Sequence, residues 1–198
     1  RLIDMAATSH SLENTWTFWE IKTGANEKSY GNSFRSVADF NTIEKFWEVF
    51  LSMPRASEIF GDGTRKVLVE GREVKALCLF KKGITPEWED ERNRDGAEFN
   101  AVKVLTPDAL DAHWENIVYA LIGEVLDEEE NICGVRLVHQ GKKMKGGFKF
   151  EVWLRKSDPE IANKIKVKLA EVLVDSNEKL KPSFRFSATD FAGWVLHS

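Results

Sequence analysis

The sequence predicts an α+β fold in which helices cover one face of a mainly antiparallel sheet. Three well-separated segments carry helix start signals, and short stretches rich in β-branched and aromatic residues lie between them. Hairpin-length loops such as QGKKMKGG, residues 140–147, favour antiparallel pairing of consecutive strands. The opposite face of the sheet is then uncovered and free to bind something.

The three helices are expected where a capping residue precedes a run with helical spacing. Asn41 should cap the first, with Glu44 as its capping-box partner. The second should run from Thr106-Pro107 to Gly123, and the third should begin at Asp158-Pro159. The apolar face of the first helix is predicted to be Ile43, Phe46, Trp47 and Phe50, and strands are predicted at 15–21, 33–40, 76–80, 101–105, 132–139, 148–154 and 183–186.

The bulk composition fits one domain spanning residues 1–198, because 198 residues with 42% hydrophobic content can bury one substantial core. With 28 basic and 32 acidic residues, the chain lacks the overall positive field of a non-specific nucleic-acid binder. Any contact with nucleic acid should therefore be local. Residues 54–72 are rich in glycine and charge and are predicted to form a mobile loop or insertion.

The two cysteines, Cys78 and Cys133, show no metal-ligand spacing, and no apolar run approaches the roughly 18 residues of a membrane span. We therefore expect no metal, no cofactor and no membrane segment. Reduced thiols predict a cytoplasmic setting, with the nucleus as the alternative.

Tryptophan is the residue type that points to function, because the chain has seven, more than a core of this size requires. Trp88 is followed at once by Glu89 in a polar loop within LFKKGITPEWEDERNRDGAEF. An indole can stack on a guanine while a carboxylate accepts from its N1–H and amino group. Without further context, the same pair could be a loop plug beside a solvated charge.

Five segments, in order, supply that context: HSLENTWTFW, NTIEKFW, LFKKGITPEWEDERNRDG, ALIGE and the stretch from ICG to VWLRK. Together they resemble the eukaryotic initiation factor 4E family over roughly residues 10–190. The resemblance implies a single curved sheet of about eight strands with three helices on its convex face. It also implies a messenger-RNA cap in the concave slot and a partner protein, carrying a Tyr-x-x-x-x-Leu motif, on the convex side.

Carried over by position, Trp88 resembles one of the two stacking aromatics and Glu89 the carboxylate that pairs with guanine. Tyr30 stands where the family usually has its second stacking Trp. Trp153 resembles the Trp near the N7-methyl group, although it could equally be a core residue.

Basic residues should neutralise the cap phosphates, and Lys149, four residues before Trp153, matches a family phosphate lysine. The neighbouring loop supplies Lys142, Lys143 and Lys145, which could equally be a solvated hairpin tip. Gln140 replaces a family Arg, while Glu98 and Phe99 replace a basic residue and a Trp. The handling of phosphate is therefore expected to be rearranged.

On the convex side, Trp47 resembles the family's partner-docking Trp, with His10, Ile43 and Gly123 nearby. Tyr119 replaces a Leu of the second helix, and Glu115-Asn116 replaces Leu-Glu. These departures predict a divergent, monomeric paralogue whose partner, a scaffold initiation factor or a regulatory binding protein, has an altered motif.

The predicted function is binding of the 7-methylguanosine 5′ cap in translation initiation or its regulation, without catalysis. One alternative is a hydrolase of caps or nucleotides that uses the same guanine pocket, although the sequence has no phosphate-binding loop of P-loop spacing and no nucleophile elbow. Another is a general RNA-stacking module, which the acidic net charge disfavours.

Overall fold

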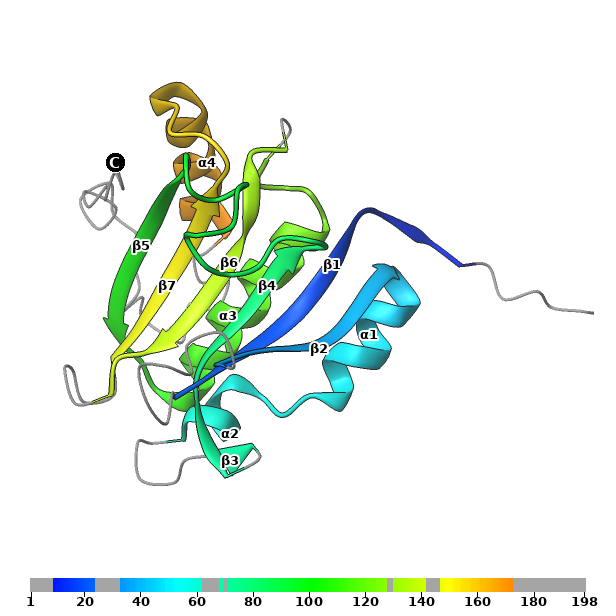
Figure 1. The fold of residues 1–198 in the computed structure, drawn as a ribbon, viewed down its shortest axis with the longest axis vertical. Helices are drawn as coiled ribbons and strands as arrows, with labels where there is room; N and C mark the ends of the chain where they lie inside the picture. Colours follow the sequence, from blue (N-terminus) through cyan, green and yellow to red (C-terminus); the bar gives the residue numbers. More distant parts are fainter. Residues whose placement is uncertain are drawn as a thin grey trace, which may run out of the picture.

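The computed structural model describes residues 9–23, 33–61, 68–69, 71–127, 130–141 and 147–172. Its core is an open sheet in the order β2-β1-β4-β6-β7-β5, with β3 paired to the first two residues of β4 (Figure 1). Every strand pair is antiparallel, as predicted. The strands are β1 (Ser11–Lys22), β2 (Phe34–Thr42), β3 (Leu68–Val69), β4 (Arg72–Lys81), β5 (Ala97–Val104), β6 (Ile132–His139) and β7 (Gly147–Leu154).

The sheet therefore has seven strands within the described residues, one fewer than the eight or so expected. Six of the seven strands predicted by range are present, and the seventh, at 183–186, lies outside the described residues. The helices are α1 (Ile43–Ser52), α2 (Ala56–Phe60), α3 (Pro107–Ile122) and α4 (Pro159–Val172).

The main core lies between the helices and one face of the sheet. The alternation of β-strand side chains sends one set toward the helices and the other set away from them. Figure 1 shows α3 running behind β4 and β6. The core includes Leu79 of β4, Leu137 of β6 and Phe150 of β7, packed with Ile117 of α3 and Ile165 of α4. This face is the one that the resemblance assigned to the helices.

Helix α1 begins one residue later than predicted. Thr42, and not Asn41, is its N-cap, and the Thr42 hydroxyl accepts from the Lys45 backbone N–H at 3.1 Å. Asn41 is the penultimate residue of β2, so its backbone is extended before the helix begins. Glu44 does not complete a capping box, because its carboxylate accepts from the backbone N–H of His10 and lies 2.6 Å from its Nδ1.

The other two predicted helix starts are confirmed. Thr106 caps α3, with Pro107 in its first turn, and the helix ends at Gly123. The Asp158 carboxylate accepts from the backbone N–H groups of Glu160 and Ile161, which caps α4 in the same way.

The segment 54–72 is not simply a loop. Residues 56–60 form α2, and the Glu58 carboxylate accepts from the Arg55 backbone N–H at 2.8 Å at its start. Ala56, Ile59 and Phe60 are buried at helical spacing, and this apolar face explains why the segment folds. No helix of the described residues is long and apolar enough to cross a membrane.

Candidate functional site

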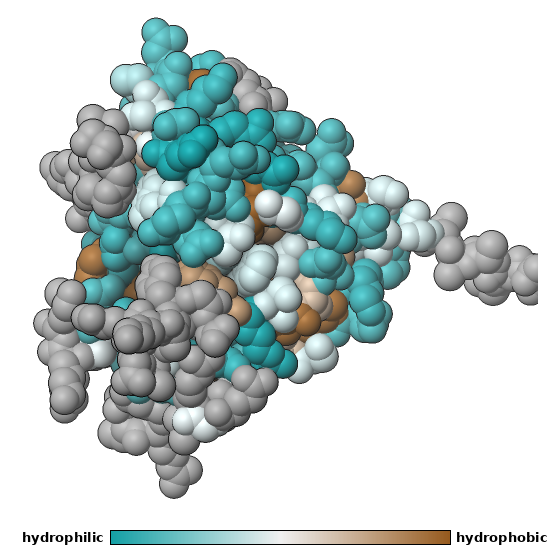
Figure 2. All heavy atoms as spheres, viewed as in Figure 1, coloured by the Kyte–Doolittle hydropathy of each residue, from teal (hydrophilic) through white to brown (hydrophobic). Residues whose placement is uncertain are grey.

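The face of the sheet away from the helices carries a mixed apolar and charged surface. Residues Lys149, Glu151 and Trp153 alternate along β7 and so share this face. The register pairs Trp153 with Glu98 of β5, and Glu151 with Arg136 of β6. On the face shown in Figure 2, the described surface is mostly hydrophilic, with paler and apolar residues toward the middle.

Trp88 lies directly on Trp153. The two indole rings are stacked, with centroids 4.0 Å apart and planes 15° from parallel. Trp153 is fully buried, whereas Trp88 is half-buried and Glu89 is exposed. Trp88 is thus a partly buried residue packed against the smaller apolar cluster, which also contains Trp153 and Phe80.

Trp153 is held from the side by Phe80 of β4. The two rings meet edge to face, with centroids 5.5 Å apart and planes at 80°. Gly134 of β6 allows this approach, because a Cβ at that position would lie 2.4 Å from Phe80 Cγ. The stacking platform therefore depends on a glycine in the middle of a strand, and this explains why ICG precedes VRLVH.

The loop that carries Trp88 and Glu89 is fixed by its own polar residues. The Asp90 carboxylate accepts from the backbone N–H groups of Thr85, at 2.8 Å, and Arg92, at 3.0 Å. The Asn93 side chain is fully buried and donates to the carbonyls of Thr85 and Glu87, both at 2.8 Å. Such a loop presents its aromatic and acidic side chains in a defined position.

Charge is concentrated in the same loop. Burial raises the pKa of Glu87, and repulsion from Glu89 and Asp90 raises it further. Glu87, Glu89 and Asp90 therefore lie close enough to one another to interact electrostatically.

A buried ionic network continues from Trp153 along the sheet. The Trp153 Nε1–H donates to Glu151 at 3.1 Å, and Lys149 Nζ donates to Glu98 at 3.0 Å. Lys149 Nζ is also 2.9 Å from Glu151 Oε1, while Arg136 Nε lies 3.3 Å from Glu151 Oε2 as an ion pair without hydrogen-bond geometry. The Arg136 guanidinium also sits 5.1 Å from the centre of the Trp153 ring.

The network holds Lys149 in its charged form. Burial lowers the pKa of Lys149, but attraction to Glu151 and hydrogen bonds to Glu151 and Glu98 outweigh burial, so the pKa lies above its usual value. Both carboxylates are almost completely buried, with side-chain exposures of 5% for Glu98 and 7% for Glu151.

The structure links Trp88, Trp153 and Lys149, three of the eight residues predicted for cap binding, through the indole stack and Glu151, and Glu89 is exposed beside Trp88. Tyr30, Lys142, Lys143 and Lys145 lie outside the described residues. Sequence reasoning missed Glu151 and Arg136 as members of the site. The period-two alternation of FKFEVWL, which places Glu151 between Lys149 and Trp153 on one face, is the signal that could have found Glu151.

The helix side carries the residues predicted for partner binding. Trp47 of α1 and Tyr119 of α3 pack together, with ring centroids 5.5 Å apart. Trp47 is 39% exposed and Ile43 is 43% exposed, whereas Phe46 of the same predicted apolar face is buried and Phe50 is partly buried. The Ile43 backbone N–H donates to the His10 carbonyl at 2.9 Å, which places these two residues side by side.

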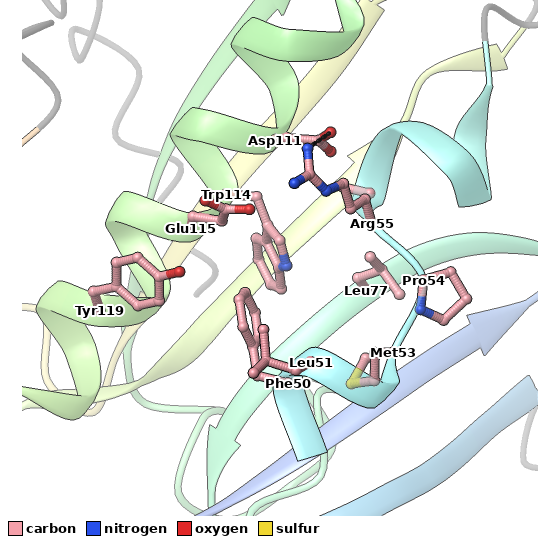
Figure 3. A pocket seen from close by; sticks show the side chains of 11 residues that line it. Phe50, Leu51, Met53, Pro54, Arg55, Leu77, Asp111, Trp114, Glu115 and Tyr119 are labelled. Atoms are coloured by element: carbon pink, nitrogen blue, oxygen red, sulfur yellow. Dashed lines mark ion pairs between the residues drawn. The ribbon is translucent and has the colours of Figure 1, made fainter. Parts of the chain in front are cut away.

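Gly123 ends α3 close to this surface, because a Cβ there would lie 3.0 Å from the Tyr119 carbonyl oxygen. A pocket of about 270 Å³ opens beside Tyr119, between the end of α1, the start of α2 and α3 (Figure 3). Its apolar lining includes Phe50 and Trp114, and Glu115 also lines it. Arg55 reaches toward Asp111, 3.9 Å away, at the α2 side.

Within the described residues, no group of three or more His, Cys, Asp or Glu side chains could hold a metal ion. The carboxylates of the network are instead paired with Lys149 and Arg136. The arrangement can stack on an aromatic ligand through Trp88 and accept hydrogen bonds from it through Glu89.

Comparison with known proteins agrees with this geometry. Residues 11–192 match the family profile described as eukaryotic initiation factor 4E, and the chain belongs to this family. The initiation factor isoform 4E of Arabidopsis thaliana is 30% identical over 173 residues, covering 86% of this chain and 80% of the relative. Factor 4E of Saccharomyces cerevisiae is 30% identical over 167 residues, covering 83% of this chain and 70% of the relative.

The chain spans only 56% of the length of its Dictyostelium discoideum relative and 65% of one from Schizosaccharomyces pombe. Among solved structures, Ascaris suum eIF4E-3 with an m7G cap superposes with a TM-score of 0.68 at 29% identity, covering 84% of this chain and 85% of that one. A complex of C. elegans eIF4E-3 with the binding protein Mextli gives the same TM-score at 27% identity, covering 86% and 90%. The family comprises translation initiation factors and not enzymes, so nothing supports the hydrolase alternative.

Proposed function

We propose that this chain binds the 7-methylguanosine cap of messenger RNA and acts in translation initiation or its regulation. The observation that carries the proposal is the Trp88–Glu89 pair, held by a hydrogen-bonded loop beside a second stacked indole. The Ascaris suum relative was solved with two different methylated caps, which supports a cap as the ligand of this fold.

In this proposal the methylated base stacks on Trp88, and Glu89 accepts from the guanine N1–H and amino group. Methylation at N7 leaves the base cationic, so each aromatic ring contributes about 0.5–2 kcal/mol beyond ordinary stacking. The carboxylates Glu87 and Asp90 lie in the same loop and add to the preference for a cationic base. Tyr30 is proposed as the second stacking ring.

A role for Trp153 at the methyl group requires a movement of Trp88. Trp153 is completely buried and its ring is stacked against Trp88 at 4.0 Å. A ligand can therefore reach Trp153 only when Trp88 turns away. With Trp88 in place, Trp153 supports the stacking ring from below.

The proposal is tested by calorimetric titration of the whole chain with 7-methylguanosine triphosphate and with unmethylated GTP. We expect binding that depends strongly on the methyl group. Glu89→Ala should weaken binding by about 1–3 kcal/mol, because the donors of the base lose a charged acceptor. Glu91→Ala, an exposed carboxylate two residues away, is the matched control and should bind as the unmodified chain does. Equal affinity for both nucleotides would refute the proposal.

We place the phosphate contacts among Lys142, Lys143, Lys145 and Lys149, and we propose a cytoplasmic location, with the nucleus as the alternative. Two carboxylates already pair with the Lys149 ammonium group, so a phosphate there competes with Glu98 and Glu151.

The helix side is proposed to dock a scaffold initiation factor or a regulatory binding protein. The exposed Trp47 and Ile43, with Tyr119 and His10, form a partly apolar surface suited to an amphipathic helix. The C. elegans relative was solved with a 4E-binding protein, which supports a partner of this kind.

We propose that this partner differs from an ordinary Tyr-x-x-x-x-Leu peptide, because Glu115 places a carboxylate at the pocket beside Tyr119. An ordinary peptide should bind weakly, and Glu115→Leu should strengthen its binding. The control is Glu171→Leu, which makes the same replacement at an exposed position of α4. Tight binding of the ordinary peptide by the unmodified chain would contradict this proposal.

A further inference from the structure

The charged side chains around Lys149, where we place the phosphates, neutralise one another. Four charged side chains of the sheet meet beside Trp153: the cations Lys149 and Arg136 and the carboxylates Glu98 and Glu151. Two positive and two negative charges sum to zero. Both carboxylates are within hydrogen-bond distance of Lys149 Nζ, at 3.0 Å and 2.9 Å.

We propose that Glu98 and Glu151 withdraw Lys149 from phosphate binding, so that this chain selects its cap mainly by the methylated base and each phosphate adds little affinity. The inference deepens the proposed function and rests on it. Glu98 and Glu151 are the specificity-determining residues, since they occupy the lysine that would otherwise attract phosphate.

The position of the network supports this assignment. Glu98 pairs in register with Trp153, and Lys149 lies four residues away from Trp153 along β7. At about 3.3 Å per residue the distance along the strand is roughly 13 Å. A chain of phosphates that starts at a base stacked on Trp88 and runs along β7 would pass Glu98 and Glu151 before or while it reaches Lys149.

The burial of Glu98 and Glu151 strengthens their electrostatic interaction with Lys149. Glu98 and Glu151 expose only 5% and 7% of their side chains, whereas Lys149 exposes 25%. Buried charges are poorly screened by salt and solvent, so the pairing of Lys149 with Glu98 and Glu151 persists at physiological ionic strength. Asn100 fixes Glu98 further by donating to its Oε1 at 3.0 Å, so the carboxylate is held where it meets Lys149.

Breaking the ion pairs between Lys149 and the two carboxylates is unfavourable. Releasing Lys149 to a phosphate would leave two buried carboxylates with one fewer counter-charge. Glu151 in addition accepts from the buried Trp153 Nε1 and pairs with Arg136, so it cannot turn away without leaving both. A ligand phosphate must therefore compete with two carboxylates that are already in place.

The first test titrates the unmodified chain with 7-methylguanosine and its mono-, di- and triphosphates, with GTP as the unmethylated control. We expect less than about a threefold gain in affinity for each added phosphate. Affinity should also change little with salt, because few counterions are released. A gain of tenfold or more for each added phosphate would overturn the inference.

The second test is Glu98→Gln, which preserves the size of the side chain and its ability to accept from Lys149 and Asn100. Removing one negative charge should raise affinity for the triphosphate by about tenfold, the size of one charge-assisted contact, and leave the nucleoside unchanged. Glu91→Gln, which removes an exposed carboxylate from the nearby loop, should change neither. An unchanged affinity for the triphosphate in a folded Glu98→Gln chain would also overturn the inference.

The two proposals fail in different ways. If methylated and unmethylated triphosphates bind equally, or neither binds, the proposed function is wrong. If the methylated base is still preferred but affinity rises steeply with phosphate number, only the neutralised phosphate end is wrong. The titration series of the unmodified chain decides between these outcomes even if the variants fail to fold.

Discussion

Replacing Glu151 by Ala should destabilise the whole chain, because this carboxylate has three partners. The Trp153 Nε1–H is completely buried and would lose its acceptor, at a cost of about 1–3 kcal/mol. Lys149 and Arg136 expose 25% and 21% of their side chains, so solvent compensates in part and each lost ion pair costs about 0.5–1 kcal/mol. The expected total is about 2–5 kcal/mol.

Urea denaturation followed by circular dichroism measures this loss directly, and thermal unfolding should show a Tm about 5–15 °C lower for a chain of this size. Glu151→Gln should lose less, since an amide oxygen can still accept from Trp153. Glu91→Ala, at an exposed position of the Trp88 loop, should change stability by less than about 0.5 kcal/mol. A loss below about 1 kcal/mol for Glu151→Ala would show that the network is not a structural support.

Three further predictions concern other parts of the fold. Thr42→Ala should cost about 1 kcal/mol in urea denaturation and Asn41→Ala less than half of that, because Thr42 caps α1; equal losses would contradict this. Burial raises the pKa of Cys78 to about 12 and that of Cys133 to about 11, so neither thiol should react with a disulfide reagent at pH 8 until the chain unfolds. Burial lowers the pKa of Lys149, but Glu151 and Glu98 raise it above its usual value, so its stabilising contribution is complete below the usual lysine pKa and declines as pH rises beyond it. The difference in unfolding free energy between the unmodified chain and Lys149→Met should therefore be constant from about pH 6 to 9 and shrink above about pH 10.5, and a change in the neutral range would refute the assignment.

The helices and most strands could be predicted from the sequence because their signals are local. Thr106-Pro107 and Asp158-Pro159 each place a capping side chain before a proline, and both helices begin there. The start of α1 is not fixed by the local sequence, since Asn41 and Thr42 are both good capping residues. The pairing of β2 with β1 continues to Thr42, and this tertiary contact decides where the helix begins.

The segment 54–72 could not be judged from composition alone. Its glycines and charges suggest a loop, yet five of its residues form α2. Besides its buried apolar face, the helix is anchored by Asp111 of α3, which accepts from the Ser57 backbone N–H at 2.8 Å and from its hydroxyl at 2.6 Å. Asp111 is 54 residues away in sequence, so nothing within the segment itself reveals this anchor.

In the candidate site, too, local features could be predicted from the sequence, whereas contacts between distant residues could not. Trp88 and Glu89 were identified because adjacent residues in one loop carry the resemblance, and the loop's hydrogen bonds are local. The contact of Trp88 with Trp153 joins positions 65 residues apart, and Glu98 meets Lys149 across 51 residues. Only the strand order brings these side chains together. Without the sheet register, the sequence identifies Lys149 as a candidate phosphate ligand but does not reveal the carboxylates that pair with it.

Support for the base and neutralisation of the phosphate end depend on one residue, Glu151. Its Oε2 holds the Trp153 indole on which Trp88 stacks, and its Oε1 holds Lys149. Removing Glu151 to release the lysine would therefore also weaken the platform for the base. Glu98 contacts Lys149 and Asn100 and makes no hydrogen bond to Trp153, so phosphate affinity can change at Glu98 with the stacking platform intact. For this reason Glu98→Gln isolates phosphate selection, whereas variants of Glu151 report on selection and stability together.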